Sequence, residues 1–481
     1  MKKSLIAMTS ITYAMKAKNL LNSLKYYCEI QRTPKDLGTG CGYSIAVTAP
    51  PEEITAMLRA WVQLAVKATF SVCAPNISAA CCLTAHTIQK RDIRAKEVRK
   101  INTRSIINFD NSATTYPKPP AVAKAVAQAV ERYGGNPGRS GHKLSMRVSE
   151  KIFAVRQQAA EMFGAQTENV AFTANCTHAL NMAIKGVMQY GGHMIISDHE
   201  HNAVARPVYA LSKTRGVKYS IARTGETDSE TVEKFRRLIT PETKCICCTV
   251  ASNVTGRLMP YRELAVLCKA HGICFIADGA QACGLVELSL SDGFNFLCTA
   301  GHKALYGPTG TGLLISDGEY SLSTIIEGGT GATSALLEQT PFLPEKLESG
   351  TINTVGIIGL GEGLTFVHQK TPAVIKAHEE KLCKQLYEQL SDIDKIKFYE
   401  ADQKKVPILS FNIGDIPSAE IASYLSEKGF ALRGGLQCAA VTHTTLGTIE
   451  QGTVRFSPSA FSTPQQVTAL SRTIKIFAAN N

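Results

Sequence analysis

The chain has 481 residues and a formal net charge of +12, with 44% hydrophobic and 19% charged residues. This length allows about three compact domains, and the composition is that of a globular protein, which excludes a disordered or fibrous chain. Residues 1–104 hold most of the excess charge, with 16 Lys and Arg against 6 Asp and Glu. A basic region can bind nucleic acid or a membrane surface. No nucleic-acid motif accompanies it, so we interpret it as a solvated face and expect neither partner.

The 15 cysteines are an odd number, and many lie in apolar runs such as KCICCTV. This pattern favours buried thiols in a reducing, cytoplasmic environment over a disulfide framework. Cys73, Cys81 and Cys82 match no zinc-ligand spacing, so we expect no metal. No stretch of about 18 apolar residues predicts a transmembrane helix.

Residues 1–70 have the pattern of a small α/β domain. The expected elements are a strand at 3–10, a helix at 11–24, a strand at 26–34, a glycine-flanked turn followed by a strand within 38–51, and a helix at 52–66. Residues 71–104 have no clear period and include the charge run QKRDIRAKEVRKINTR, so we predict a basic linker.

From residue 105 to 481 strand and helix patterns alternate, which favours a mostly parallel sheet covered by helices on both faces. The candidate strands are VAFT, HMIIS, KCICCTV, CFIAD, FLCTA and TGLLIS. We expect a large domain at about 125–365 and a smaller α/β domain at about 366–481 that also takes residues 105–124.

Two motifs suggest a cofactor site. Lys303 lies in TAGHKALYGPTGTG, after a strand and beside a histidine, which suits a lysine that forms a Schiff base with an aldehyde. Asp278 ends the apolar run CFIAD, where a carboxylate can pair with a protonated pyridine nitrogen. Taken singly, each has an ordinary alternative, an exposed loop lysine and a helix-capping aspartate. Their occurrence together favours the cofactor.

Two further segments follow predicted strands. FTANCTHALNMAIKG begins a helix near Thr177, and a helix N-terminus with hydroxyl and backbone donors can hold a phosphate, although such helix starts are common. SDHEHNAVARP places His201 after a strand, where it either stacks on an aromatic ring or belongs to a surface histidine cluster.

The last motif is the glycine-rich segment LRGGLQCAA, which contains Cys438. A mobile loop suits a nucleophile that must reach a substrate and then turn outward, but Cys438 is also one of many cysteines. Arg455, in GTVRFSPSAF, has the planar fork that binds a carboxylate through two hydrogen bonds.

Together these segments resemble the cysteine desulfurase and selenocysteine lyase family, in the class V aminotransferase-like group of fold-type I enzymes that use pyridoxal 5'-phosphate (PLP). The resemblance runs from INFDNSATTYPKPP, beginning near Ile107, to the C-terminus. It is nearer to the Suf-type branch, in which the reactive cysteine lies in a short RxGxxCA loop. It implies a PLP-dependent transferase fold of type I with a smaller C-terminal α/β domain.

The resemblance also implies the following roles. At the cofactor ring, Lys303 would form the Schiff base, Asp278 would pair with the pyridine nitrogen, Gln281 would contact the ring hydroxyl and His201 would stack on the ring. Thr177 and His302 would bind the phosphate, with Cys176 nearby through its backbone, and Thr330 would reach the phosphate of a neighbouring subunit. Asn253 would lie near the ring and the substrate, Arg455 would clamp the substrate carboxylate, and Arg433 would order the cysteine loop.

The implied reaction converts L-cysteine to L-alanine, with Cys438 attacking as a thiolate to become a persulfide. An acceptor protein or small thiol then takes the sulfur. L-selenocysteine is an alternative substrate, and the position of Thr330 implies a homodimer. A selenocysteine lyase, an aminotransferase and a non-catalytic carrier or scaffold remain open. Gln437 precedes Cys438 where many relatives carry histidine, which leaves the activation of the thiol in question.

Residues 1–70 resemble a small selenium/sulfur carrier domain through TSITYAMKAKNLL and GTGCGYSIAV. Cys41, between two glycines, is the candidate sulfur acceptor, because glycines give access and free backbone N–H groups. The alternative is a turn cysteine without a role.

Overall fold

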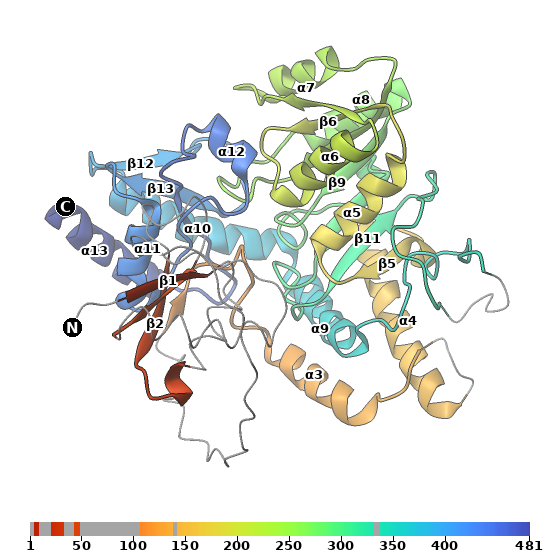
Figure 1. Cartoon of the computed structure of the whole chain (residues 1–481), viewed down its shortest axis with the longest axis horizontal. Helices are drawn as coiled ribbons and strands as arrows, with labels where there is room; N and C mark the ends of the chain where they lie inside the picture. The colour runs from red at the N-terminus through yellow and green to blue at the C-terminus, as the bar shows by residue number, and fades with distance from the viewer. Residues whose placement is uncertain (1–3, 9–20, 33–42, 49–105, 138–141, 331–336) are drawn as a thin grey trace, which may run out of the picture. The chain divides into compact units, whose positions relative to one another are not determined.

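The computed structural model describes residues 4–8, 21–32, 43–48, 106–137, 142–330 and 337–481 (Figure 1). The chain divides into two compact units, residues 1–101 and 102–481. In the first unit, three strands form an antiparallel sheet in the order β1 (Ser4–Met8), β3 (Tyr43–Val47), β2 (Cys28–Arg32). Each lies where the sequence predicted a strand. The helix expected at 52–66, and most of the one expected at 11–24, lie outside the described residues.

The second unit is built on a seven-stranded sheet. Its strands, from one edge to the other, are β5 (Val170–Thr173), β11 (Gly312–Ser316), β10 (Phe296–Ala300), β9 (Cys274–Asp278), β8 (Thr243–Thr249), β6 (His193–Ser197) and β7 (Lys218–Ala222). The five strands from β10 to β7 run parallel to one another. The sequence predicted all of these strands except β7.

Strand β11 is the exception to the parallel arrangement, because it runs antiparallel to both β10 and β5. Residues 301–311, which join β10 to β11, contain no helix. A parallel neighbour needs a crossover connection of a dozen or more residues, usually a helix, so this shorter segment returns the chain antiparallel. The same short connection holds Lys303.

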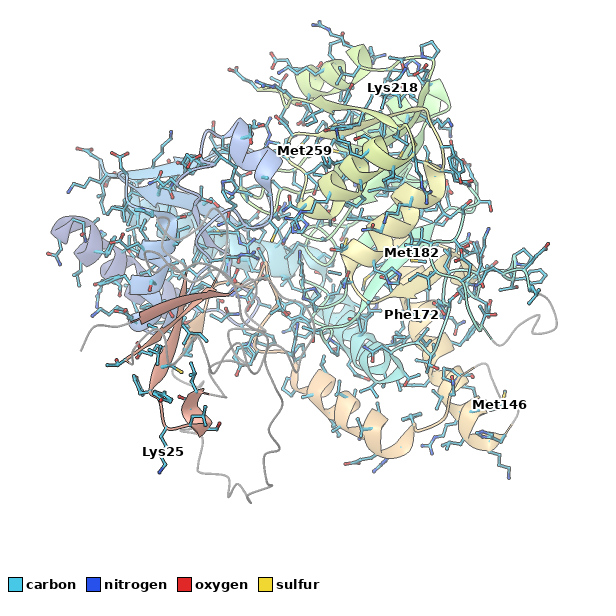
Figure 2. The ribbon with its side chains drawn as sticks, in the orientation of Figure 1. Lys25, Met146, Phe172, Met182, Lys218 and Met259 are labelled. Carbon is cyan, nitrogen blue, oxygen red and sulfur yellow. The ribbon has the colours of Figure 1, made fainter. Side chains whose placement is uncertain are left out.

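Helices cover both faces of the sheet. Alternate residues of one strand therefore enter different cores: Ile195 belongs to one core, whereas Met194 and Ile196 belong to the other. Phe172 and Met182, which Figure 2 labels, likewise belong to different cores. This burial on two sides explains why the strands read as continuous apolar runs.

The helices of this sheet are α3 (Pro120–Arg132), α4 (Lys143–Phe163), α5 (Cys176–Val187), α6 (Asn202–Thr214), α7 (Asp228–Arg237), α8 (Tyr261–His271) and α9 (Thr354–Lys370). Helix α9 packs against α3 and α4, and α5 packs against α6. No helix within the described part of the chain has the length and apolar character that a bilayer crossing needs.

The C-terminal part has its own sheet and core. Strands β12 (Ile396–Tyr399), β13 (Leu409–Ile413) and β15 (Val454–Phe456) are antiparallel neighbours. Its helices are α10 (Pro372–Leu390), α11 (Ser418–Glu427), α12 (Ala440–Thr445) and α13 (Pro464–Asn480). A short strand β4 (Ile107–Asn108) pairs with β14 (Phe430–Ala431), and Phe109 enters this core. Residues far apart in the sequence thereby join beside the segment that carries Cys438.

Candidate active site

The carboxyl ends of β8, β9 and β10 lie side by side at one edge of the large sheet. In the strand register Thr249 is opposite Asp278, and Asp278 is opposite Cys298. Lys303 follows β10 by three residues. Because ligands of open α/β sheets bind outside the carboxyl ends of the strands, this edge is the expected place for a cofactor.

A cavity of about 200 Å³ lies at this edge. It brings together ten of the residues singled out from the sequence, which come from seven separate segments of the chain. They are Cys176, Thr177, His201, Asn253, Asp278, Gln281, His302, Lys303, Arg433 and Arg455. The fold thus collects basic, acidic and hydrogen-bonding groups around one small space.

Lys303 and Asp278 are the charge pair of this cavity. Burial lowers the pKa of Lys303, while the nearby Asp278 opposes that shift. Burial raises the pKa of Asp278, opposed by a hydrogen bond from the Ala280 backbone N–H at 2.9 Å and by the charge of Lys303. Desolvation therefore makes the lysine easier to deprotonate, which a nucleophilic amine requires.

Cys176 contacts the same carboxylate. Its thiol donates a hydrogen bond to Oδ1 of Asp278, with the two atoms 3.4 Å apart. Burial, followed by the charge of Asp278, raises the pKa of Cys176 well above its ordinary value. The side chain is therefore a thiol that donates, and it adds a contact that a backbone role alone would not supply.

His201 is the N-cap residue of α6. Its Nδ1 accepts a hydrogen bond from the Ala203 backbone N–H at 3.0 Å, which fixes the ring. Burial, assisted by the cations Lys303 and Arg433, lowers the pKa of His201 to about 3. The imidazole is consequently neutral at physiological pH, as a ring that stacks on an aromatic system should be.

The N-terminus of α5 forms the other side of the cavity. Asn175 caps it by accepting a hydrogen bond from the His178 N–H at 2.9 Å. The first N–H groups of the helix, at Cys176 and Thr177, have no carbonyl of their own helix to bind. Burial lowers the pKa of His302 to about 4. This end of the cavity suits an anion held by neutral donors and the helix dipole.

Arg455 lies on β15 and is 1% exposed. Its Nη2 contacts Asp110 Oδ1 at 2.6 Å, and its Nη1 donates to the carbonyl of Asn253 at 2.9 Å. Burial lowers its pKa, and Asp110 opposes the shift. The guanidinium is therefore held from two sides in the wall of the cavity, as a carboxylate-binding arginine needs.

The Cys438 side chain lies outside the lining, but the neighbouring Gln437 and the loop residue Arg433 belong to it. Cys438 Sγ is 3.3 Å from Arg433 Nη2. Of the eleven cysteines that the structure describes, Cys438 is exposed and the rest are buried. It is the accessible thiol of the described chain, and its loop borders the cavity.

Comparisons with known proteins identify the family of the chain. The model of the Aminotransferase class-V family matches residues 107–470. The chain belongs to this family. A cysteine desulfurase of Klebsiella pneumoniae is 32% identical over 352 residues, which cover 71% of this chain and 86% of the relative. The described fold also resembles the apo structure of a cysteine desulfurase from Thermococcus onnurineus, with a TM-score of 0.73, 26% identity, and coverage of 79% and 96%.

Within the class V family, the chain groups with the cysteine desulfurases. A protein of Methanothermobacter thermautotrophicus described as a probable cysteine desulfurase is 28% identical over 377 residues, which cover 76% of this chain and 94% of the relative. A second family model, Se/S carrier protein-like, matches residues 3–67. The N-terminal resemblance read from the sequence therefore has an independent match.

One predicted site residue of this class V protein, Thr330, lies elsewhere. Thr330 lines a separate cavity of about 700 Å³, together with Arg156 and Glu348. That cavity is larger than the first, but among the described residues that line it there is no lysine, histidine or cysteine to supply the amine and thiol of the proposed chemistry. Cys41 falls outside the described residues.

The described residues contain no group of three or more His, Cys, Asp and Glu side chains that could hold a metal ion. Cys73, Cys81 and Cys82 lie outside the described residues.

The sequence did not single out Lys118, although this residue binds the segment that holds Lys303. Its Nζ donates to the carbonyl of His302 at 2.7 Å, and the Thr115 hydroxyl donates to the carbonyl of Lys303 at 3.1 Å. Burial lowers the pKa of Lys118 to about 8. A lysine followed by two prolines gave no signal for this role, because its partner carbonyl is 184 residues away.

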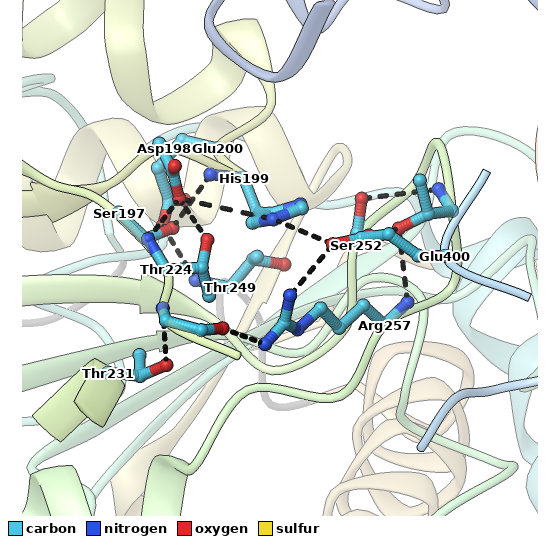
Figure 3. Close-up of polar contacts among 12 residues, drawn as sticks. Ser197, Asp198, His199, Glu200, Thr224, Thr231, Thr249, Ser252, Arg257 and Glu400 are labelled. Atoms are coloured by element: carbon cyan, nitrogen blue, oxygen red, sulfur yellow. Dashed lines mark hydrogen bonds and ion pairs between the residues drawn. The ribbon is translucent and has the colours of Figure 1, made fainter. Parts of the chain in front are cut away.

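A second group that the sequence left out is a buried polar network at the end of β6 (Figure 3). Glu200 accepts hydrogen bonds from the Ser197 hydroxyl at 2.5 Å and the Thr249 N–H at 2.8 Å. Burial, with a further contribution from Asp278, raises the pKa of Glu200 to about 8. Arg257 continues the network to Glu400 at 2.8 Å. At neutral pH Glu200 is mainly uncharged, so it adds little negative charge near Asp278.

Proposed function

We propose that this cysteine desulfurase family member binds PLP in the Lys303–Asp278 cavity and transfers the sulfur of L-cysteine to Cys438, with L-alanine as the second product. The observation that carries the proposal is the convergence of Lys303, Asp278 and Arg455 in one buried cavity beside the loop of an exposed cysteine. An amine, a carboxylate and an arginine in that arrangement suit an amino-acid substrate and an aldehyde cofactor.

The residues present fit the cofactor. Within the described chain, His302 Nδ1, Asn253 Oδ1 and Arg455 Nε are buried without a hydrogen-bond partner. All three belong to residues that line the cavity. Since buried polar atoms are nearly always paired, these three unpaired atoms support the proposal of a polar ligand in this space.

The proposed holding residues follow from their chemistry. Asp278 would hold the proton of the pyridine nitrogen, and His201 would stack on the ring. Gln281, whose Nε2 donates to the Ser112 carbonyl at 3.1 Å, would reach the ring hydroxyl. Thr177 and His302, with the first N–H groups of α5, would bind the phosphate. When bound, PLP supplies an electron sink for the bonds broken at the substrate.

The chain's own residues perform the remaining steps. Arg455 and Asn253 orient the substrate carboxylate. Lys303, whose pKa is lowered by burial, takes the proton from the substrate Cα and later returns protons to the product. Cys438 attacks the substrate sulfur as a thiolate, with Arg433 beside its Sγ to stabilise the charge.

Atoms and electrons balance within this step. The new S–S bond forms as the Cβ–S bond breaks, and the electron pair of the broken bond remains on Cβ. Protonation at Cβ gives alanine, while the sulfur pair is oxidised to a persulfide. A second thiol then attacks the persulfide and takes the outer sulfur.

We propose Cys41 as one such acceptor, acting in cis or in trans, alongside other protein or small-molecule thiols. Two observations support this: the match of residues 3–67 to the Se/S carrier protein-like family, and the sequence Gly-Cys-Gly, which favours an accessible thiol.

We also propose that L-selenocysteine uses the same site, and that the chain is a homodimer in which Thr330 reaches the partner's phosphate. Sedimentation velocity tests the dimer.

Mass mapping of the cysteine-treated holoenzyme tests the proposed function. We expect one added sulfur on the Cys438 peptide, release of alanine, and a later sulfur on the Cys41 peptide. The Cys438→Ala variant should retain the cofactor absorbance at about 420 nm and lose sulfide release. Unchanged desulfuration by that variant would overturn the assignment of Cys438, and keto-acid-dependent amino transfer would favour an aminotransferase.

A further inference from the structure

The cysteine loop has an unusual backbone at its reactive residue. Gln437 and Cys438 have φ angles of +41° and +59°, in the left-handed region that side chains other than glycine rarely adopt. A side chain with a Cβ atom is strained in this conformation. Surrounding contacts must therefore hold this conformation.

Gln437 supplies much of this support through its side-chain amide. It is 2% exposed. Its Nε2 donates to the carbonyls of Arg433 at 3.2 Å and Thr453 at 2.6 Å. Its Oε1 contacts His443 Nε2 at 2.8 Å and the Thr453 hydroxyl at 3.3 Å. Every polar position of the amide is engaged, so Gln437 acts as a buried cross-link and not as an acid or base.

His443 completes the cross-link. It lies in α12 with 0% exposure, and its Nδ1 contacts the Thr448 hydroxyl at 2.7 Å. The two carbonyls fix the orientation of the Gln437 amide, which leaves Oε1 toward His443. Because Oε1 only accepts, His443 Nε2 carries the hydrogen and Thr448 donates to Nδ1. Burial lowers the pKa of His443 to about 4, so this neutral form persists at physiological pH.

The same amide also controls the partner of the thiol. Gln437 binds the backbone of Arg433, whose guanidinium lies 3.3 Å from Cys438 Sγ. The backbone carbonyls of Gln437 and Cys438 are held as well. The Asn253 side chain donates to the first at 2.8 Å, and the Asn202 N–H donates to the second at 2.7 Å. One buried connection thus places both the sulfur and its cation at the edge of the cavity.

We propose that His443 is a positioning residue which, through Gln437, holds Cys438 beside Arg433. The inference rests on the proposed function, in which Cys438 receives the sulfur. In this chain, the imidazole missing from the position before the cysteine has a structural counterpart five residues after it. It donates to the loop from within the protein and does not exchange protons with the substrate.

The test compares His443→Ala with His443→Gln in the holoenzyme. Glutamine places an amide donor near the position of Nε2, so it is the matched control. We expect His443→Ala to slow alkylation of Cys438 by iodoacetamide about threefold at pH 7, because the loop no longer holds the sulfur beside Arg433. We expect its kcat for alanine to fall at least about tenfold, with KM for cysteine unchanged within about twofold.

His443→Gln should recover most of both values. Equal alkylation rates and equal kcat values for His443→Ala and the natural protein would overturn the proposal. A His443→Gln variant as impaired as His443→Ala would also overturn it. If His443→Ala fails to fold, His443→Gln decides alone by resembling the natural protein or not. Peptide mapping must locate the alkylation at Cys438. If the natural protein released no alanine from cysteine, the proposed function would be rejected instead. The alkylation rates would still report on the role of His443.

Discussion

The cofactor cavity and the cysteine loop present their reactive groups through different kinds of structure. In the cavity, Asp278 ends a fully buried strand, and Lys303 follows the next strand of the same sheet. Its electrostatics come from desolvation, which shifts the pKa values of both residues. In the loop, Cys438 is exposed, its backbone is strained, and a guanidinium lies beside the sulfur.

This difference corresponds to two tasks. Proton transfer at the substrate needs a dry site in which charges interact strongly. Sulfur transfer to another thiol needs a group that a partner can reach. Variants of the cavity should therefore change the absorbance of bound PLP together with activity, whereas variants of the loop should change sulfur transfer and leave the absorbance unaltered.

The largest expected effect comes from Lys303→Ala in the cavity. Removal of the amine removes both covalent attachment and the general base, so alanine formation should fall by about 10³-fold or more. The measurement is alanine release under saturating PLP and cysteine. Lys303→Arg is the matched control, since it keeps the charge but supplies no amine that forms a Schiff base. Activity near the natural level in either variant would contradict the assignment.

Asp278→Asn should have the next largest effect. The amide cannot balance a protonated pyridine nitrogen, so we expect activity about 10²-fold lower, with an altered pH dependence of the absorbance near about 420 nm. Asp278→Glu keeps the charge and serves as the control for its position. An unaltered spectrum in Asp278→Asn would place this carboxylate away from the ring.

Arg433→Gln tests the loop side of the comparison. Loss of the cation beside Cys438 should slow persulfide formation about tenfold while the PLP absorbance stays unchanged. Arg433→Lys should recover part of the rate, because it returns the charge without the planar fork. Single-turnover alanine release provides the rate. A changed spectrum with an unchanged rate would reverse the division between cavity and loop.

Glu200→Gln should give the smallest effect, on stability alone. The folded pKa of about 8 lies above the ordinary value of 4.5, so between these pH values the folded state holds one more proton than the unfolded state. Stability therefore falls as pH rises through this window, by up to about 1.4 kcal/mol per pH unit. Denaturant unfolding at several pH values should show a flatter slope in Glu200→Gln. An identical slope would mean that Glu200 is already ionised in the folded protein.

Much of the fold follows from local patterns. Strands β5, β6, β8, β9, β10 and β11 were predicted because burial on both faces makes most of their residues apolar. Strand β7 was missed because it lies at the sheet edge, where most of its residues are exposed. The antiparallel direction of β11 depends on the length of one connection, which the strand pattern itself does not contain.

The site was predicted to the extent that its residues lie at strand ends or in glycine-rich segments, as Asp278 and Lys303 do. Lys118, Glu200 and His443 act through partners chosen by the folded structure. Their signals in the sequence are those of ordinary polar residues. His443 in particular acquires meaning only when α12 brings it to the amide of Gln437.

The proposed function requires that Lys303 is covalently joined to PLP in the resting protein. Borohydride reduction of the purified holoprotein, followed by peptide mass spectrometry, tests it most directly. We expect a stable pyridoxyl adduct on the peptide that contains Lys303 and on no other lysine peptide. An unmodified Lys303 after reduction, or an adduct at another lysine, would contradict it.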